Sequence, residues 1–371
     1  MFKQHKKITS LILLLFIALG LSGCSITFGT SNNNSMIDGG VYKSFNRGVT
    51  WKQNSLVAST GSKPITFNSA NVVALAVDPQ DENAIYAGTD TGGMLYSYDG
   101  GASWSVAYDL GKRYVKDIKI SPTDKCTIYV ASENKVFKSE DCNRSWDDMY
   151  YDNNTGVMIR SLAIDPRNEN IIYAGTSRGD IITSSDAGKS WSALERFSED
   201  ILFRGKREMN IIKIIVSERN SNNLWIATEA NGVFKSVNRG ATWQSFEEEF
   251  KEIHTSNSLL VSDIDLFAGD GKTIIVATKA GLLRSFDAGA HWQVVDLVPP
   301  SDSTAINAVK MHPTDPSIIY YATNTSFGIT DDGGQEWTSK KLPSTRAGVV
   351  LIPDPSDPEI VYLGMKSIIK K

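Results

Sequence analysis

The chain of 371 residues has few cysteines and histidines and no long basic block. Three cysteines are too few for a small domain held together mainly by disulfides. His254, His291 and His312 stand singly, without the spacing of zinc ligands, and no motif indicates a cofactor, so we expect neither a metal nor a cofactor. Outside the first seven residues no basic cluster occurs, and the formal net charge is −4, which argues against a nucleic-acid partner.

Aromatic residues and glycine, in contrast, are plentiful: the chain contains 14 Phe, 8 Trp, 13 Tyr and 29 Gly. This composition excludes a disordered or collagen-like chain and indicates a soluble, globular and β-rich protein. The composition alone says nothing about chemistry.

The first 23 residues have the pattern of a secretory signal. Lys3, Lys6 and Lys7 precede an apolar run from Leu11 to Leu19, which is shorter than the about 20 residues of a membrane-spanning helix. Leu21-Ser22-Gly23-Cys24 then resembles a bacterial lipobox. That resemblance implies cleavage before Cys24 and a lipid attached to its thiol; the alternative is an ordinary signal peptide with a chance cysteine.

Residues 24–38 predict a flexible tether, since the stretch Thr30–Ser35 is small and polar. We expect residues 39–371 to form the folded body. The mature protein would then be mildly acidic and extracytoplasmic, held by lipid at the periplasmic or cell-surface side of a membrane.

One motif, Ser/Thr-x-Asp/Asn-x-Gly-x-x-Trp, recurs along the chain. Its copies end at Trp51, Trp104, Trp146, Trp191, Trp243, Trp292 and Trp337, with spacings of 42 to 53 residues. Each copy predicts a tight hairpin, because the Asp or Asn side chain can accept turn N–H groups and Gly supplies a positive φ. The copy ending at Trp146 has Asn143 instead of Gly, and Asn tolerates that conformation.

Each unit predicts four strands: an apolar strand, a strand like Ile171–Thr176, a third strand and the strand that the Trp opens. Four strands repeated at this period predict an all-β protein, a seven-bladed β-propeller of four-stranded antiparallel blades. The N-terminal piece supplies only two outer strands and the C-terminal piece only two inner ones. We therefore expect a composite blade from both termini to close the ring and remove its open edge. Six or eight blades are the alternatives, and Ser367–Lys371 could add a strand that competes with Val41–Ser44.

These repeats resemble the Asp-box (BNR) repeats of sialidases, sortilin-type receptors and two-propeller xyloglucan-active glucanases. With single-domain size, seven units and a lipobox, the chain looks more like the lipoproteins that assist photosystem II assembly and their non-photosynthetic relatives. The resemblance covers nearly the whole mature chain and is specific for the fold. It is weak for function, because family members with different activities all carry Asp boxes.

Cys126 and Cys142 lie in two links that the predicted blade brings to the same end of its sheet. Cysteines that meet in an exported protein usually pair, so we expect a disulfide, and a closed loop of this size adds about 3 kcal/mol on the chain-entropy model. Two reduced core cysteines are the alternative.

Four arginines in four different blades stand just before first strands: Arg113, Arg160, Arg207 and Arg346. First strands line the channel of a propeller, so these side chains could ring its mouth, with Arg178 beside them. Arginine carries a planar fork suited to carboxylate or phosphate. We interpret the set as a ligand-binding basic patch that grips an anionic segment of a protein partner; solvated loop charges are the alternative.

No local motif nominates a catalytic set. The sequence therefore favours a lipid-tethered protein-interaction module, such as an assembly factor or scaffold for a membrane complex, over an enzyme. The alternative from another class is a glycan-binding or glycoside-hydrolase protein, of sialidase-like or xyloglucanase-like type.

Overall fold

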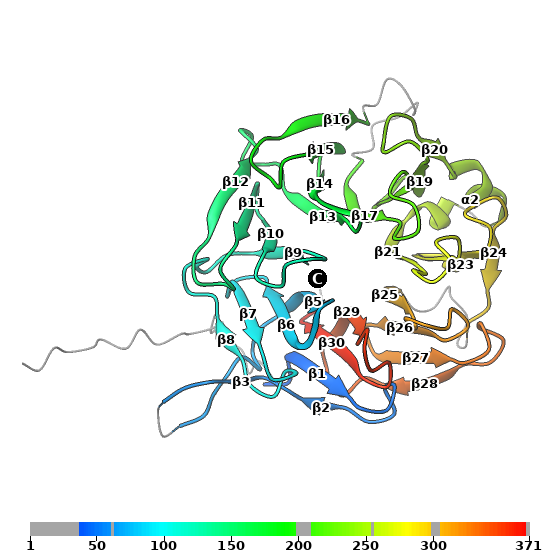
Figure 1. Ribbon diagram of the computed structural model, residues 1–371. Coiled ribbons are helices and arrows are strands. Elements are labelled where there is room, and N and C mark those ends of the chain that lie inside the picture. Colours follow the sequence, from blue (N-terminus) through cyan, green and yellow to red (C-terminus); the bar gives the residue numbers. More distant parts are fainter. Residues whose placement is uncertain (1–36, 61–62, 198–208, 254–255, 298–304, 369–371) are drawn as a thin grey trace, which may run out of the picture.

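The computed structural model describes residues 37–60, 63–197, 209–253, 256–297 and 305–368. Over these residues the chain forms seven four-stranded antiparallel sheets arranged as a ring (Figure 1). The predicted seven-bladed propeller is confirmed, and the blade made from both ends of the chain is present.

Six blades are continuous in sequence, and in each the first strand lies innermost. Blade 1 consists of β5 (Val72–Asp78), β6 (Asp81–Thr89), β7 (Met94–Ser97) and β8 (Ser105–Val106). Blade 2 consists of β9 (Val115–Ile120), β10 (Ile128–Ser132), β11 (Lys135–Ser139) and β12 (Asp147–Tyr151). Blade 3 consists of β13 (Ile159–Asp165), β14 (Asn168–Thr176), β15 (Asp180–Ser184) and β16 (Ser192–Arg196). Blade 4 consists of β17 (Ile211–Val216), β18 (Leu224–Thr228), β19 (Val233–Ser236) and β20 (Gln244–Ser245). Blade 5 consists of β21 (Val261–Leu266), β22 (Ile274–Thr278), β23 (Gly281–Ser285) and β24 (Gln293–Val295). Blade 6 consists of β25 (Ile306–Met311), β26 (Ile319–Thr323), β27 (Ser326–Thr330) and β28 (Thr338–Lys341).

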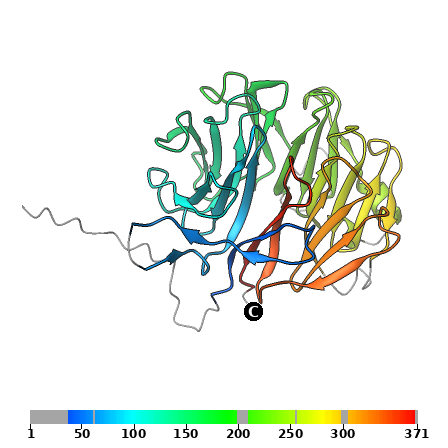
Figure 2. The same cartoon turned by 60° about the horizontal axis from the view of Figure 1, so that its bottom comes forward.

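The closing blade, blade 7, joins the two ends of the chain (Figure 2). Its strand order is β2-β1-β30-β29, from β1 (Gly40–Ser44), β2 (Lys52–Gln53), β29 (Ala347–Pro353) and β30 (Val361–Lys366). Tyr42 of β1 pairs with Leu363 of β30, so β30 is the C-terminal strand that pairs with β1. Of the segment Ser367–Lys371, the described residues Ser367 and Ile368 lie outside any strand.

The hairpin motif, which we call the Asp box, folds through its own side chains. In blade 1 the Ser97 Oγ accepts a hydrogen bond from the Gly101 N–H at 2.9 Å, and Asp99 accepts one from the Ser103 N–H at 2.8 Å. The motif glycine lies in the left-handed region in six copies, and Asn143 takes φ 71° at the same position in the seventh. The sequence prediction for Asn143 is therefore confirmed.

The hydrophobic core lies between neighbouring blades rather than inside one sheet. Ala131 and Val136 of blade 2 pack in one cluster with Ile159 and Leu162 of blade 3. The motif tryptophans belong to these interfaces: the ring centroid of Trp51 lies 5.1 Å from that of Phe327 in blade 6. Each blade therefore buries its face only against its neighbours, which is why the ring must close.

Two additions fill the links between a fourth strand and the next first strand. A small hairpin, β3 (Leu56–Val57) and β4 (Ile65–Thr66), precedes blade 1, and α2 (Glu247–Ile253) with the 3-10 helix η1 (Ser256–Leu259) precedes blade 5. The sequence motif predicted neither, since both lie outside the repeat. No helix within the described ranges is long and apolar enough to cross a membrane.

The ring has two ends. We call the end that carries the links from fourth to first strands the connection face, and the opposite end, which carries the Asp boxes, the box face.

Candidate functional site: the central channel

The innermost strands of all blades enclose a central cavity of about 380 Å³. Figure 1 shows β5, β9, β13, β17, β21, β25 and β29 around the middle of the ring. Side chains from each of these strands line the cavity. A volume of this size falls within the usual range for small-ligand sites.

Every innermost strand carries a register shift at the same place, near its start and so toward the connection face. In each blade this shift leaves one residue of the innermost strand without a partner on the second strand. From blade 1 to blade 7 these residues are Val73, Lys116, Arg160, Ile212, Ser262, Asn307 and Val349. All seven residues line the cavity, and we call them the bulge ring. A bulge re-aims a side chain and ends regular pairing, so the fold places one variable residue of each blade at the channel mouth.

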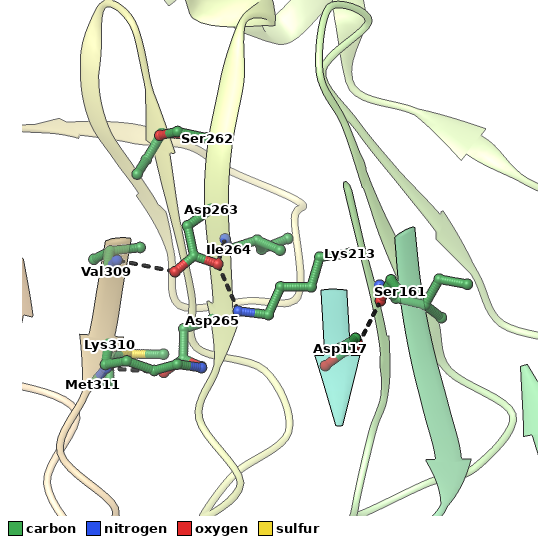
Figure 3. Close-up of polar contacts among 12 residues, drawn as sticks. Asp117, Ser161, Lys213, Ser262, Asp263, Ile264, Asp265, Val309, Lys310 and Met311 are labelled. Atoms are coloured by element: carbon green, nitrogen blue, oxygen red, sulfur yellow. Dashed lines mark hydrogen bonds and ion pairs between the residues drawn. The ribbon is translucent and has the colours of Figure 1, made fainter. Parts of the chain in front are cut away.

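Deeper in the channel, charged side chains connect neighbouring blades (Figure 3). Lys213 of β17 donates to Asp263 of β21 at 2.6 Å, and the other oxygen of Asp263 accepts the Val309 N–H of β25 at 3.0 Å. In the same way Asp265 pairs with Lys310 and accepts the Met311 N–H at 2.9 Å. These carboxylates therefore satisfy backbone N–H groups at the edge of the next innermost strand, which would otherwise have no partner there.

The pKa values of this network follow from burial and from the opposite charges. Burial alone would raise the pKa of Asp263, but the ammonium groups of Lys213 and Lys310 hold it below its ordinary value. Burial would likewise lower the pKa of Lys310, and the carboxylates of Asp265 and Asp263 raise it above its ordinary value instead. Burial lowers the pKa of Lys213, and the carboxylate of Asp263 opposes that shift. The pKa directions of Asp263 and Lys310 both favour their charged forms.

Blades 2 and 3 carry a second set of contacts. Asp117 of β9 pairs with Lys119 at 2.8 Å and accepts the Leu162 N–H of β13 at 2.8 Å. The Ser161 Oγ accepts the Ile214 N–H of β17 at 3.0 Å. The acidic groups at this depth are thus bonded to lysine and backbone.

Lys116 and Arg160 differ from these groups. They are neighbours in the bulge ring, on β9 and β13, and both are half-buried in the cavity wall. Among the described residues neither has a hydrogen-bonding or ion-pairing partner, and the Nε of Arg160 is fully buried without one. Burial and then the charge of Arg160 lower the pKa of Lys116 to about 8. Two like charges held side by side in this way favour the binding of an anion.

The arginines that the sequence nominated do not form one cluster in the described structure. Arg160 lines the cavity as part of its innermost strand, whereas the Arg113 guanidinium lies 4.2 Å from the ring centroid of Phe137. Arg178 is held by the two carboxylates of Asp152 and Asp180.

Arg346 is only 5% exposed. Its Nη1 donates to the Ala70 carbonyl at 3.2 Å and to the Asn71 side chain at 2.9 Å, and its Nε lies 3.6 Å from Asp38. This side chain therefore fixes the segment that leads into β1 of the closing blade. Arg207 lies outside the described residues.

Of the three cysteines, two lie within the described residues and one lies outside them. The structure joins Cys126 and Cys142 through a disulfide, which links the loop between β9 and β10 to the Asp box of blade 2. Cys24, with the predicted signal and most of the predicted tether, lies outside the described residues. No three His, Cys, Asp or Glu side chains come together as a metal-binding group in the part of the chain that the structure describes.

The sequence analysis missed Lys116, Lys213, Asp263 and Lys310. A signal was available, because each is a charged residue within the apolar-rich strand that comes first, and so innermost, in its unit. Charge in such a strand indicates that it faces a channel or a partner rather than the core.

Comparisons with known proteins agree with this fold. A family model described as Sortilin-Vps10 (sortilin, neurotensin receptor 3) matches residues 92–211. A xyloglucanase from a Paenibacillus species is 22% identical over 339 residues, which cover 78% of this chain and 32% of that protein. The chain therefore spans about a third of the length of this curated relative.

Two kinds of solved structure are similar. A GH74 xyloglucanase from Xanthomonas campestris has a TM-score of 0.64 at 16% identity, over 85% of this chain and 52% of that one. YCF48 from Cyanidioschyzon merolae has a TM-score of 0.61 at 17% identity, over 80% and 96%. YCF48 bound to D1 peptide has a TM-score of 0.59 at 15% identity, over 80% and 94%. At such identities these likenesses show the propeller fold alone.

Proposed function

We propose that this protein is an extracytoplasmic interaction module, held to a membrane by lipid at Cys24, that binds an anionic segment of a protein partner at the channel mouth. The observation that carries the proposal is the pair Lys116 and Arg160, two half-buried cations without a partner among the described residues. An assembly factor or scaffold for a membrane complex is the role that fits such a module. The similarity to the structure of YCF48 bound to D1 peptide, which covers 94% of that chain, supports a protein partner.

The mouth suits an anionic segment for a physical reason. Each unpaired cation in a partly dry wall has lost water contacts without gaining a counter-charge, and a carboxylate from a partner would restore that balance. The arginine fork can bind a carboxylate through two parallel hydrogen bonds.

Binding to a fluorescent peptide tests this proposal. The probe is a short peptide of alternating glutamate and serine, and its glutamine counterpart is the reference. We expect Lys116→Glu with Arg160→Glu to weaken binding of the glutamate peptide by at least about tenfold, which is about 1.4 kcal/mol. Lys189→Glu with Lys272→Glu is the matched control, because it makes the same charge change on exposed residues of the box face.

Equal binding of the two peptides to the unaltered protein contradicts the proposal. So does an equal loss of binding in the mouth variant and the control, since the effect would then reflect net charge rather than the mouth.

The lipid anchor is tested separately. A Cys24→Ser variant is expected to move from the membrane fraction to the soluble fraction, and mass spectrometry of the unaltered protein is expected to find an acylated N-terminus at Cys24. An unmodified Cys24 contradicts the anchor and leaves an ordinary signal peptide.

A glycan-binding or glycoside-hydrolase role is the second candidate, supported by the similarity to xyloglucanases. Glycoside hydrolysis commonly needs two carboxylates that can act as acid and as base or nucleophile. In the described channel Asp117 and Asp263 are each bonded to a lysine and to a backbone N–H, which supports binding over hydrolysis there. Release of reducing sugar from xyloglucan, or cleavage of fluorogenic sialosides, would support the enzyme instead.

A further inference from the structure

The bulge ring is chemically divided. Lys116 and Arg160 of blades 2 and 3 supply its charge, and Val73 and Val349 of blades 1 and 7 form an adjoining apolar side. On the apolar side the wall continues down the channel through Leu75, Val350, Leu351 and Ile352, with no charged residue among them. The cavity therefore offers a cationic place at its mouth beside an apolar wall.

The remaining polar members of the ring are already used. The Ser262 Oγ donates to the Ile306 carbonyl at 2.6 Å. The side-chain amide of Asn307 donates to Asn324 at 2.9 Å and to the Gly348 carbonyl at 3.1 Å. Of the ring, Lys116 and Arg160 alone keep their donors for a ligand among the described residues.

No carboxylate in the described part of the chain pairs with these two cations. Asp117 is bonded to Lys119 and to the Leu162 N–H. Glu229, which lines the cavity from the end of β18, accepts a hydrogen bond from Asn210 and forms no ion pair within the described ranges. Within the described ranges, therefore, no carboxylate forms an ion pair with Lys116 or Arg160, and their donors are available to an anionic ligand.

Two donors on one side and an apolar wall on the other suit a small amphiphilic anion. A carboxylate is planar and carries one charge, so one guanidinium fork and one ammonium can satisfy it. A phosphate has more acceptor oxygens and more charge than these two groups can satisfy, and it gains nothing from the valines. The volume of about 380 Å³ leaves room for an apolar group of side-chain size next to the carboxylate.

We propose that the channel mouth binds a free carboxylate that carries a compact apolar group, with the carboxylate between Lys116 and Arg160 and the apolar group against Val73 and Val349. This inference deepens the proposed function and rests on it, since it uses the same mouth. The chemistry has two sources: the apolar C-terminal residue of a protein, or a free apolar acid.

Calorimetric titration of the full chain with small probes tests the inference. The probes are N-acetyl-leucine, its amide, acetate and inorganic phosphate. We expect N-acetyl-leucine to bind at least about tenfold more tightly than each of the others, because it alone has both the charge and the apolar group. Equal binding of the acid and the amide overturns the carboxylate, and equal binding of acetate overturns the apolar contact. Tighter binding of phosphate overturns the choice of a carboxylate.

Three variants locate the site. Arg160→Gln and Val349→Ser are each expected to weaken N-acetyl-leucine binding by at least about tenfold, while Arg113→Gln, whose guanidinium lies on Phe137 outside the cavity lining, is expected to leave it unchanged. Lys116→Arg keeps the charge and is expected to retain binding, whereas Lys116→Gln is expected to lose it. Circular dichroism checks that each variant is folded, and an equal loss in Arg113→Gln overturns the placement.

Two peptides of one sequence ending in leucine, one with a free C-terminal carboxylate and one amidated, separate the sources. Tighter binding of the free-acid peptide than of N-acetyl-leucine supports a protein C-terminus, and exclusion of both peptides supports a free acid. If the glutamate–serine peptide binds and N-acetyl-leucine does not, this inference fails and the proposed function stands. If N-acetyl-leucine binds and the glutamate–serine peptide does not, the proposed anionic segment fails and the carboxylate site stands.

Discussion

The Nζ of Lys213 lies 2.6 Å from Oδ1 of Asp263, and this ion pair joins the innermost strands of blades 4 and 5 inside the channel. The same carboxylate also accepts the Val309 N–H of blade 6, so one side chain connects three consecutive blades. A ring of sheets depends on such contacts, because each blade touches only its two neighbours.

Replacement of Asp263 by Asn is expected to destabilise the propeller by about 2–4 kcal/mol, because it leaves the ammonium of Lys213 in the channel wall without its counter-charge. Guanidinium-induced unfolding measures the change. Lys251→Met is the control, since Lys251 pairs with Glu248 on the surface of α2 and such pairs contribute about 0–1 kcal/mol. A loss for Asp263→Asn no larger than that of the control contradicts the assigned role.

The Asp boxes predict a defined response to acid. Hydrogen bonds from the Ser145 and Ser190 hydroxyl and N–H groups lower the pKa values of Asp141 and Asp186 to about 2. A carboxylate whose pKa is lower in the folded state stabilises that state above its unfolded pKa of about 3.9, and the contribution is lost as the pH falls through the folded value. We therefore expect the melting temperature to fall between about pH 4 and pH 2.

Asn occupies the same place in two natural boxes, at Asn46 and Asn238, where its oxygen accepts the equivalent N–H. The double variant Asp141→Asn with Asp186→Asn is therefore expected to fold and to show a shallower loss of melting temperature between about pH 4 and pH 2. An unchanged acid profile would show that the box carboxylates do not carry this dependence.

The disulfide of blade 2 predicts a stability difference that depends on reductant. Cys126→Ser with Cys142→Ser is expected to lose about 3 kcal/mol in the free energy of unfolding, because the crosslink no longer restricts the unfolded chain. Reductant should lower the stability of the unaltered protein and leave the double variant unchanged. Two reactive thiols from these positions in denatured, unreduced protein would refute the pairing.

Arg346 and Arg160 are expected to respond differently to the same substitution. Arg346→Met removes the hydrogen bonds that Nη1 donates to the carbonyls of Ser69 and Ala70 and to the side chain of Asn71, so we expect a loss of about 3 kcal/mol. Arg160→Met removes a cation that has no partner in the described structure, and its melting temperature should stay the same or rise. Faster hydrogen exchange in β1 of Arg346→Met would confirm that the lost contact is at the closing blade; similar melting temperatures for both variants would contradict the distinction.

The fold was predictable because the repeat specifies it locally. Each Asp box satisfies its own N–H groups through a serine and an acid within a few residues, as Ser97 and Asp99 do, so the hairpins can be located from sequence alone. The count of boxes and the half-units at the two ends then required a closed ring with a composite blade. The segments outside the repeat, such as α2 and the hairpin β3–β4, carry no comparable motif, and their structure was not predicted.

The channel chemistry was less predictable, since it depends on contacts between blades. Arg113, Arg160, Arg178 and Arg346 were all assigned to one patch from the sequence, yet one lies on an aromatic ring, one faces the cavity, one is ion-paired and one is buried at the closure. The same register shift occurs in every innermost strand, and it determines which residue of that strand faces the channel mouth. Its position matters because moving the pairing by one residue turns each side chain to the other face of the sheet. Local hydrogen bonding thus determined the blades from the sequence, whereas the direction and the partners of each charged side chain were decided only when seven blades met around one axis.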